Sequence, residues 1–356
     1  MSELPISVCI IAKNEEKYIE NCLKKLKPYG FEIIVTDTGS TDRTKEIATI
    51  YADKVFDFEW INDFSAARNF CASKASHNWI LSIDCDEYVN NMDVDTLIAV
   101  MNKYPQYVGV IRMKNLIRKN NGESGYGSDD VLRFYNRKYY CYNSPVHEQI
   151  GFRNESKINE SITTFLLPME VIHHGYFIEP EEMEKKQKRN LQLLYASLEK
   201  NQEDAYIHFQ IGQSEFILGN YENAIKYFKS GIELNSNLEH LYVQIMVESL
   251  AKTYMVLDQN EEALEIMERF QDKCKTARFT FTYANILLNT GQPLKALLYF
   301  VKITMMNDAE LLGENLLNCY KHIVELYIDM GNEEMANLFR GKIDMYIKER
   351  DRVLNS

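Results

Sequence analysis

The pattern of apolar residues changes near residue 180, and this change constrains the fold more than any other feature of the 356-residue chain. Before that point, short apolar runs alternate with stretches of helical spacing; after it, strand-like runs disappear. Strands separated by helices of this length predict βαβ units and a mostly parallel sheet that is covered on both faces. We therefore expect an α/β domain over residues 1–180 and an all-α domain over residues 181–356.

The first half divides into expected elements. The expected strands are residues 6–12, 32–37, 54–60 and 78–84, and the expected helices are 15–26, 40–52 and 63–75. Ser40 or Thr41, with an acid at 42, has the character of a helix N-cap. The longer strand-like pieces 107–113, 130–136 and 162–174 suit a mixed or antiparallel extension. Between them, the glycine-rich polar stretch 118–130 predicts either a loop that closes over a ligand or an ordinary surface loop.

The second half carries a helical repeat signal within residues 205–235. Its small and aromatic positions, which let two antiparallel helices approach and fill the groove between them, are Gly212, Gly219, Tyr221, Ala224 and Phe228. This spacing resembles a tetratricopeptide repeat, whose period is roughly 34 residues. Irregular echoes follow around Ala263, Ala296 and Ala336. The alternative is an unclassified helical bundle; either arrangement offers a concave surface for a partner.

Composition excludes some classes of function. The chain has 40 lysines and arginines against 52 acids, a formal charge of −12. This makes the chain a poor candidate for a general nucleic-acid binder, because phosphate affinity is largely cationic in origin, but it does not exclude a phosphate ligand held by one local site or by a metal. The N-terminal apolar run is too short to span a bilayer and lacks the basic flank of a secretion signal. Seven cysteines without a pairing pattern suggest reduced packing residues, so we expect a cytoplasmic protein without a transmembrane segment.

Polar residues follow three of the expected strands, where an open parallel sheet binds its ligands. They are Lys13, Asn14 and Glu15 after the first strand, Asp37, Gly39 and Ser40 after the second, and Asp84, Asp86 and Glu87 after the fourth. Asp37 suits a hydrogen bond to a ribose or base, or else an Asx turn. No G-x-G-x-x-G motif follows the first strand, which argues against a dinucleotide fold. The convergence of three strand ends predicts a ligand site at this edge.

The two aspartates that flank Cys85 suit a hard divalent cation. Mg²⁺ and Mn²⁺ prefer oxygen ligands and bridge to a diphosphate, and a bound cation removes the repulsion between Asp84 and Asp86. The alternative is a solvated acidic turn.

These motifs resemble a known family. Residues 62–87, NDFSAARNFCASKASHNWILSIDCDE, are similar to the stretch F-S-x-A-R-N, W-I-L, D-x-D-E that marks a subgroup of the family 2 glycosyltransferases. The segments IIAKNEE and VTDTGSTD resemble the same family's first two strand ends, in the same order and spacing. The similarity covers residues 5–180. Members of this subgroup include glucosyltransferases of the bacterial lipopolysaccharide core and S-glycosyltransferases of bacteriocin peptides, and the latter also carry a tetratricopeptide-like domain.

The resemblance implies a Rossmann-like GT-A fold and a UDP-sugar donor. It assigns to the nucleotide-sugar site Ala12, Asn14, Glu15, Asp37, Ser40, Arg68, Asn69, Asp84 and Cys85. Arg68 would face the base or the diphosphate; a surface ion pair is the alternative. Cys85 departs from the family, whose residue at that position is often small, and it is either crowded or simply packed.

The metal and catalytic residues also come from the resemblance. Asp86 would bind Mn²⁺ or Mg²⁺ directly, and His173 or His174 would complete the shell. Adjacent strand residues point to opposite faces, so we favour one of the two histidines, His173. Glu148 would be the general base and His147 would orient it or touch the diphosphate; a simple strand edge is the alternative.

We therefore expect a metal-dependent glycosyltransferase that moves a hexose to a peptide or protein acceptor, and the resemblance implies that the reaction inverts the anomeric centre. A cell-envelope glycan or lipid-linked acceptor is the alternative within the same reaction. Two rivals are a catalytically silent tetratricopeptide scaffold and a nucleotidyltransferase, although IIAKNEE lacks the glycine of a triphosphate loop. The helical domain would bind the acceptor or form a homodimer.

Overall fold

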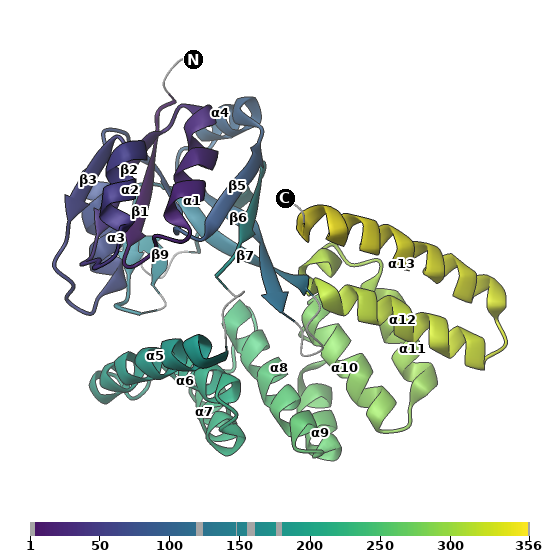
Figure 1. Ribbon diagram of the computed structural model, residues 1–356. Coiled ribbons are helices and arrows are strands. Elements are labelled where there is room, and N and C mark those ends of the chain that lie inside the picture. The colour runs from purple at the N-terminus through teal and green to yellow at the C-terminus, as the bar shows by residue number, and fades with distance from the viewer. Residues whose placement is uncertain (1–3, 119–123, 147, 155–160, 176–179, 355–356) are drawn as a thin grey trace. The chain divides into compact units, whose positions relative to one another are not determined.

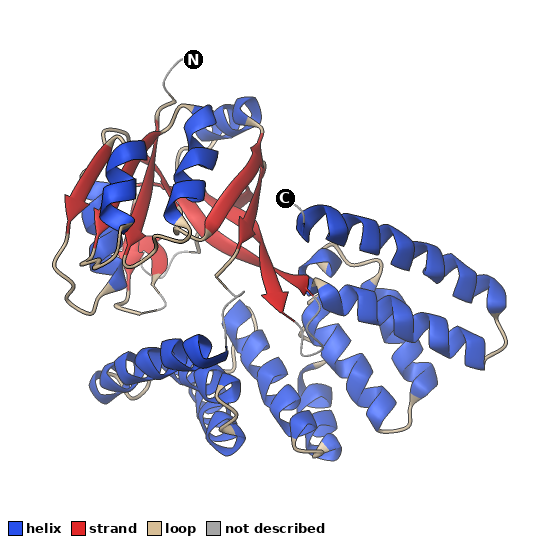
Figure 2. Ribbon diagram, viewed as in Figure 1, coloured by secondary structure: helices blue, strands red, loops and turns tan. Residues whose placement is uncertain are grey.

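The computed structural model describes residues 4–118, 124–146, 148–154, 161–175 and 180–354. The chain divides into two compact units, Met1–Phe177 and Ile178–Asn355 (Figure 1). The first unit is α/β and the second is helical (Figure 2), which confirms the predicted fold class. Among the described residues, no helix is both long enough and apolar enough to cross a bilayer.

One twisted mixed sheet organises the first unit. Its strands are β1 (Ile6–Ala12), β2 (Glu32–Asp37), β3 (Lys54–Asp57), β4 (Trp79–Ser82), β5 (Glu87–Met92), β6 (Val108–Arg118), β7 (Ser124–Asn136), β10 (Thr164–Leu166) and β11 (Met169–His173). Their order is β3-β2-β1-β4-β7-β6-β11-β5, with β10 beside β6. Strands β3, β2, β1 and β4 are parallel, whereas β7 runs antiparallel to both β4 and β6. The predicted mixed extension is thus confirmed.

Helices cover both faces of this sheet. On one face, α1 (Ile19–Leu26), α2 (Thr44–Tyr51) and α4 (Val94–Lys103) share a core with the inward residues of β1 and β2. On the other face, α3 (Phe64–Ser73) packs with the hairpin β8–β9 (Tyr140–Asn143 and Gln149–Phe152). A short 3₁₀ helix, Lys27–Tyr29, follows α1. Strand β2 is buried along its whole length, and a strand buried on both faces carries apolar residues in succession, here Ile33, Ile34 and Val35. This run is what predicted the strand from the sequence.

The start of α2 differs from the prediction. The helix begins at Thr44, so Ser40 and Thr41 are not its N-cap. Asp42 is closer to that role, because its Oδ1 accepts a hydrogen bond from the Thr44 amide at 2.9 Å. Ser40 has another task, since its hydroxyl accepts from the Asn14 amide at 3.0 Å. The hydroxyl residues therefore join two loops instead of opening a helix.

The predicted loop over residues 118–130 is also wrong in part. Residues 124–130 belong to β7, which pairs with β6 from Gly109↔Phe134 to Arg118↔Ser124. These small polar residues are held in the strand by backbone hydrogen bonds to β6, and their composition does not predict that pairing. The turn of this ribbon, 119–123, lies outside the described residues.

The second unit is built from helical hairpins. Its helices are α5 (Pro180–Lys200), α6 (Ala205–Ile217), α7 (Tyr221–Leu234), α8 (Leu241–Val256), α9 (Asn260–Phe270), α10 (Ala277–Asn289), α11 (Pro293–Ile303), α12 (Glu314–Asp329) and α13 (Glu333–Leu354), with a 3₁₀ helix at Ala309–Leu312. A Cβ atom on Gly212 of α6 would lie 2.5 Å from the Phe228 ring of α7, so only glycine permits this helix approach. Gly219 turns between them at φ 78°. The echoing alanines Ala224, Ala263, Ala296 and Ala336 are all fully buried.

Candidate active site

The loops after β1 and β2 bond to each other. Asn14, at φ 57°, accepts a hydrogen bond from the Thr41 amide at 2.8 Å. Asp37 Oδ2 accepts from the amides of Gly39 (3.1 Å) and Ser40 (3.0 Å), which is the Asx turn given as an alternative above. Asp37 Oδ1 is buried without a hydrogen-bond partner. A buried acceptor without a donor destabilises the protein unless a ligand donates to it. Asp37 can therefore form the turn through Oδ2 and still accept from a ligand on Oδ1.

Ala12 and Glu15 frame the same edge. The carbonyl oxygen of Ala12, the last residue of β1, accepts from the Thr38 amide at 2.9 Å and the Thr38 hydroxyl at 3.1 Å. The Glu15 amide donates to the Thr44 hydroxyl at 2.6 Å. The structure thus brings both residues to the edge where Asp37 and Ser40 lie.

Arg68 lies at the centre of a buried charge cluster. Its side chain is held on α3, whose N-cap Asp63 accepts from the Ala66 amide at 2.9 Å. Arg68 Nε donates to Glu148 Oε1 at 2.7 Å, and Nη2 donates to Asp84 Oδ1 at 2.8 Å. Arg68 is only 6% exposed, so it is not part of a surface ion pair. The structure joins three residues from three distant segments that the sequence had selected.

Arg133 on β7 belongs to this cluster, although the sequence analysis did not select it. Its Nη2 donates to Asp84 Oδ2 at 2.8 Å and to Glu87 Oε1 at 2.6 Å, while its Nε is buried without a partner. The available signal was a single cation between the apolar residues Leu132 and Phe134 of the expected strand 130–136. The sequence did not indicate that Arg133 belongs to the site, because its contact with Asp84 depends on the pairing of β7 with β4.

The two guanidinium groups shape the charge of the strand-end acids. Burial would raise the pKa of Asp84, but Arg133 and Arg68 outweigh it and hold that pKa well below its ordinary value. Burial raises the pKa of Glu87 to about 7 against the opposing effect of Arg133, and Asp84 adds to the rise. Asp84 is therefore a permanent anion that already has two cationic partners.

Asp86 and His173 form the best candidate metal site. Asp86 Oδ2 lies 3.2 Å from His173 Nε2, and His173 Nδ1 lies 2.8 Å from Asn115 Oδ1. A Cβ atom on Gly175 would fall 2.0 Å from Asp86 Oδ2 and 2.4 Å from His173 Nε2, so both ligand atoms face a space that only glycine leaves open. Burial lowers the pKa of His173, but the hydrogen bond that its ring donates to Asp86 outweighs this and raises it.

These two side chains fit a divalent cation, since a carboxylate and an imidazole oriented from its far nitrogen are typical ligands. Within the described ranges, no group of three or more histidine, cysteine, aspartate or glutamate side chains is placed to hold a metal. Among the described residues, Asp86 and His173 are thus the two candidate ligands for such a cation, while Asp84 is engaged by Arg68 and Arg133.

Three further selected residues make contacts within the protein, and a fourth lies outside the described residues. The His174 ring packs against Tyr88 with centroids 4.4 Å apart, and the His174 amide donates to the Asp86 carbonyl oxygen at 2.8 Å. Asn69 bonds with both ends of its amide to the Tyr142 backbone, at 2.8 and 2.9 Å. Cys85 is packed in the core at 3% exposure. His147 lies outside the described residues.

Two family models match parts of this chain. Residues 7–154 match the model of Glycosyl transferase family 2, and residues 205–238 match that of a tetratricopeptide repeat. The chain thus carries a family 2 glycosyltransferase domain followed by a tetratricopeptide region, which confirms the resemblance noted in the sequence.

Individual relatives support the same class. A TPR repeat-containing protein of Synechococcus elongatus is 29% identical over 232 residues, which are 64% of this chain and 56% of the relative. The SPbeta prophage-derived glycosyltransferase SunS of Bacillus subtilis is 29% identical over 235 residues, 65% of this chain and 54% of SunS. A glycosyltransferase of Rickettsia bellii is 28% identical over 175 residues, 46% of this chain and 59% of the relative. The chain spans little more than half the length of the curated relatives it matches.

Proposed function

We propose that this chain transfers a hexose from a UDP-sugar to a peptide or protein acceptor, with inversion and with Mn²⁺ or Mg²⁺ as cofactor. The observation that carries the proposal is the convergence of Asp86 and His173 over Gly175, beside the cluster that joins Arg68 and Glu148. The family 2 match and the glycosyltransferases among the relatives support the reaction class.

The donor site lies along the ends of β1, β2 and β4. Asp37 accepts a ribose hydroxyl or base N–H on its unpaired Oδ1, while the Asn14–Ser40 bridge holds the surrounding loops rigid. Asp86 and His173 hold the cation. When bound, that cation neutralises charge on the departing diphosphate. Asn69 and His174 are left out of this proposal because their side chains are engaged elsewhere.

Glu148 is the proposed general base. Arg68 Nε, 2.7 Å from Glu148 Oε1, fixes the orientation of the carboxylate. The second carboxylate oxygen of Glu148 takes the proton of the acceptor as the acceptor attacks the anomeric carbon. Arg68 thereby acts through Glu148 and Asp84 as a positioning residue.

The acceptor is proposed to be a peptide because stacked helical hairpins present a continuous surface to an extended chain. A homodimer through the helical unit is the alternative use of that surface. All seven cysteines are free thiols and six of them are buried, which supports the proposal that the protein works in the cytoplasm.

The test is release of UDP from a panel of UDP-sugars, with and without Mn²⁺. We expect metal-dependent release with one or two sugars in the wild type, and its loss in Asp86→Ala and His173→Ala. Asp95→Ala, on the exposed first turn of α4, is the matched control and should behave as wild type. If the wild type neither hydrolyses any donor nor binds UDP with Mn²⁺ by calorimetry, the silent scaffold replaces this proposal.

A further inference from the structure

Asn115 links the candidate metal ligand His173 to Asp129, and neither Asn115 nor Asp129 has an assigned role. Asn115 lies on β6 and is 5% exposed. Its Oδ1 lies 2.8 Å from His173 Nδ1, and its Nδ2 donates to Asp129 Oδ2, on β7, at 2.8 Å. Strand β6 lies between β7 and β11, with Asn115 opposite His173, so the sheet itself brings these three side chains together.

Only one orientation of the Asn115 amide satisfies both of these contacts. An ionised carboxylate offers acceptors only, so the group that faces Asp129 has to be the amide nitrogen. Reversal of the amide would place its oxygen 2.8 Å from a carboxylate oxygen, with no proton between the two atoms. The amide oxygen therefore faces His173, where it can only accept, and the hydrogen bond requires a proton on Nδ1 of the ring.

A proton on Nδ1 determines what the other nitrogen of the His173 ring can do. In a neutral imidazole, one nitrogen carries a hydrogen atom and the other carries a lone pair. With the hydrogen atom on Nδ1, the lone pair of Nε2 is directed toward Asp86 Oδ2, which lies 3.2 Å away. This is the form of the ring that can bind a cation between the two side chains, because a metal ligand needs an unprotonated nitrogen.

We propose that Asn115 is a positioning residue that holds the proton of His173 on Nδ1, and that Asp129 fixes the Asn115 amide in the orientation that this requires. The inference rests on the proposed function in one respect, namely that a cation binds between His173 and Asp86. Asn115 carries most of the effect because it is buried. Asp129 is exposed, so water competes for its carboxylate and its contribution is smaller.

The protonated ring nitrogen is identified in long-range ¹H–¹⁵N correlation spectra of the full chain with ¹⁵N-labelled histidine. Asp86→Ala removes the acceptor that competes for a proton on Nε2, and it also removes the candidate metal site. In this variant, at alkaline pH where the ring is neutral, we expect the proton of His173 on Nδ1. Adding Asn115→Leu keeps the approximate size of the side chain but removes the acceptor, so the proton should shift toward Nε2. A proton found on Nε2 in Asp86→Ala, or one that stays on Nδ1 after Asn115→Leu, would overturn the proposal.

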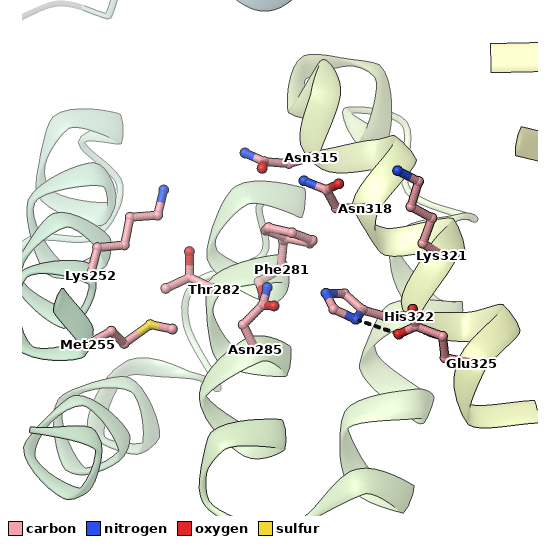
Figure 3. Close-up of a pocket in the computed structure, with 10 residues that line it drawn as sticks. All are labelled: Lys252, Met255, Phe281, Thr282, Asn285, Asn315, Asn318, Lys321, His322 and Glu325. Atoms are coloured by element: carbon pink, nitrogen blue, oxygen red, sulfur yellow. Dashed lines mark hydrogen bonds and ion pairs between the residues drawn. The ribbon is translucent and has the colours of Figure 1, made fainter. Parts of the chain in front are cut away.

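The helical unit supplies an internal reference for these spectra. His322 lines a cavity of about 370 Å³ in that unit, and its Nδ1 lies 3.6 Å from Glu325 Oε2 (Figure 3). Its ring also stacks on Phe300 of the same unit. Signals of His322, assigned by their loss in His322→Gln, should be the same in every variant. A change there would indicate a disturbed fold instead of a changed His173.

A reciprocal exchange separates the hydrogen-bond pattern from simple packing. Asn115→Asp combined with Asp129→Asn exchanges the carboxylate and the amide and keeps the net charge. The carboxylate at position 115 can then accept from His173 Nδ1 and from the amide at position 129, so the proton should stay on Nδ1. Asp130→Asn is the matched control, because Asp130 is the next residue of β7 and bonds to Arg112 instead. It should leave the His173 spectrum unchanged.

Affinity for Mn²⁺ in the presence of UDP, measured by calorimetry in the otherwise wild-type chain, is the second readout. Asn115→Leu should lower it about 10- to 100-fold, the usual effect of losing the group that orients a metal ligand, and the reciprocal exchange should restore most of it. A chain with the proton on Nδ1 that binds neither Mn²⁺ nor UDP refutes only the proposed transferase. A chain that binds Mn²⁺ with unchanged affinity after Asn115→Leu refutes only the positioning role of Asn115.

Discussion

Gly175 makes the candidate metal site unusually easy to test, because one methyl group is enough to close it. In Gly175→Ala the added carbon would lie 2.0 Å from Asp86 Oδ2 and 2.4 Å from His173 Nε2, far inside van der Waals contact. Both atoms are the ends of side chains, so they can rotate away at small cost to the fold. The backbone of Gly175 is not in the left-handed region, and alanine adds no strain there. We therefore expect the ligand geometry, and not stability, to be lost.

The expected size of the effect follows from the number of ligands displaced. Loss of a single orienting contact to a metal ligand typically costs 10- to 100-fold in metal affinity. Since Gly175→Ala moves both protein ligands, we expect Mn²⁺-dependent UDP affinity to fall at least about 100-fold, or roughly 2.7 kcal/mol. The free energy of unfolding should change by less than about 1 kcal/mol. Titration calorimetry of UDP with Mn²⁺ measures the first quantity, and urea denaturation the second.

A matched control separates this effect from loss of a glycine in general. Gly127→Ala, on β7, places its new carbon where nothing lies within 4 Å, and it should bind UDP as the wild type does. Unchanged Mn²⁺-dependent UDP binding in Gly175→Ala would refute the assignment of Asp86 and His173 as the metal ligands.

Three further predictions concern stability. Arg133→Met removes the cation bonded to buried Glu87 and one of the two bonded to Asp84, and it should lower the free energy of unfolding by about 2–4 kcal/mol, with Arg133→Lys intermediate. Equal stability of the two variants in urea would contradict a bridging role. Burial raises the pKa of Glu32, but hydrogen bonds from a lysine and two serines outweigh it and lower that pKa to about 2, below its usual 4.5. Glu32 thus stabilises the fold above about pH 4.5 and loses this effect as the pH falls toward 2. We expect Glu32→Gln to lower the free energy of unfolding by about 2 kcal/mol at pH 7, and this difference from the wild type should shrink below pH 4.5. Denaturation series at several pH values measure it. Gly212→Ala forces a carbon to 2.5 Å from Phe228 and should destabilise the helical unit by about 1–3 kcal/mol, whereas Gly341→Ala, with nothing within 4 Å, should not; thermal unfolding distinguishes them.

The sequence was sufficient where local composition determines structure. The predicted bounds of β1 and β2 agree with the structure, because both strands are buried and their apolar runs end where the chain turns into loops. The fourth strand was predicted too long. It ends at Ser82, since Asp84 turns the chain by accepting the Glu87 amide on its carbonyl oxygen at 3.1 Å. Acidic residues marked the site but not the point at which the strand ends.

The sequence was insufficient where the site depends on strand order. Arg133 reaches Asp84 only because β7 lies antiparallel beside β4, with Leu81 opposite Phe134, and no local motif encodes this pairing. Alternation along a strand predicted that one of two adjacent histidines would face the metal. The pairing of β11 with β5, in which His173 lies opposite Glu87, determines that the His173 ring lies beside Asp86. Roles of Asp86, Glu148 and the nucleoside-binding residues stay predictions until they are measured.

The position of β11 between β6 and β5 has a consequence for the order in which the protein folds. Asp86 and His173 are 87 residues apart in the chain, and β11 is the last strand of its unit to leave the ribosome. The first strands can pair early, whereas the insertion of β11 requires closure of a long loop. The entropy cost of that closure comes before the favourable contacts of β11 form. We expect the two ligand side chains to meet only when this strand inserts. Affinity for a cation would then be acquired in the final step of folding, and a nascent chain that still lacks β11 would have a sheet but no metal site.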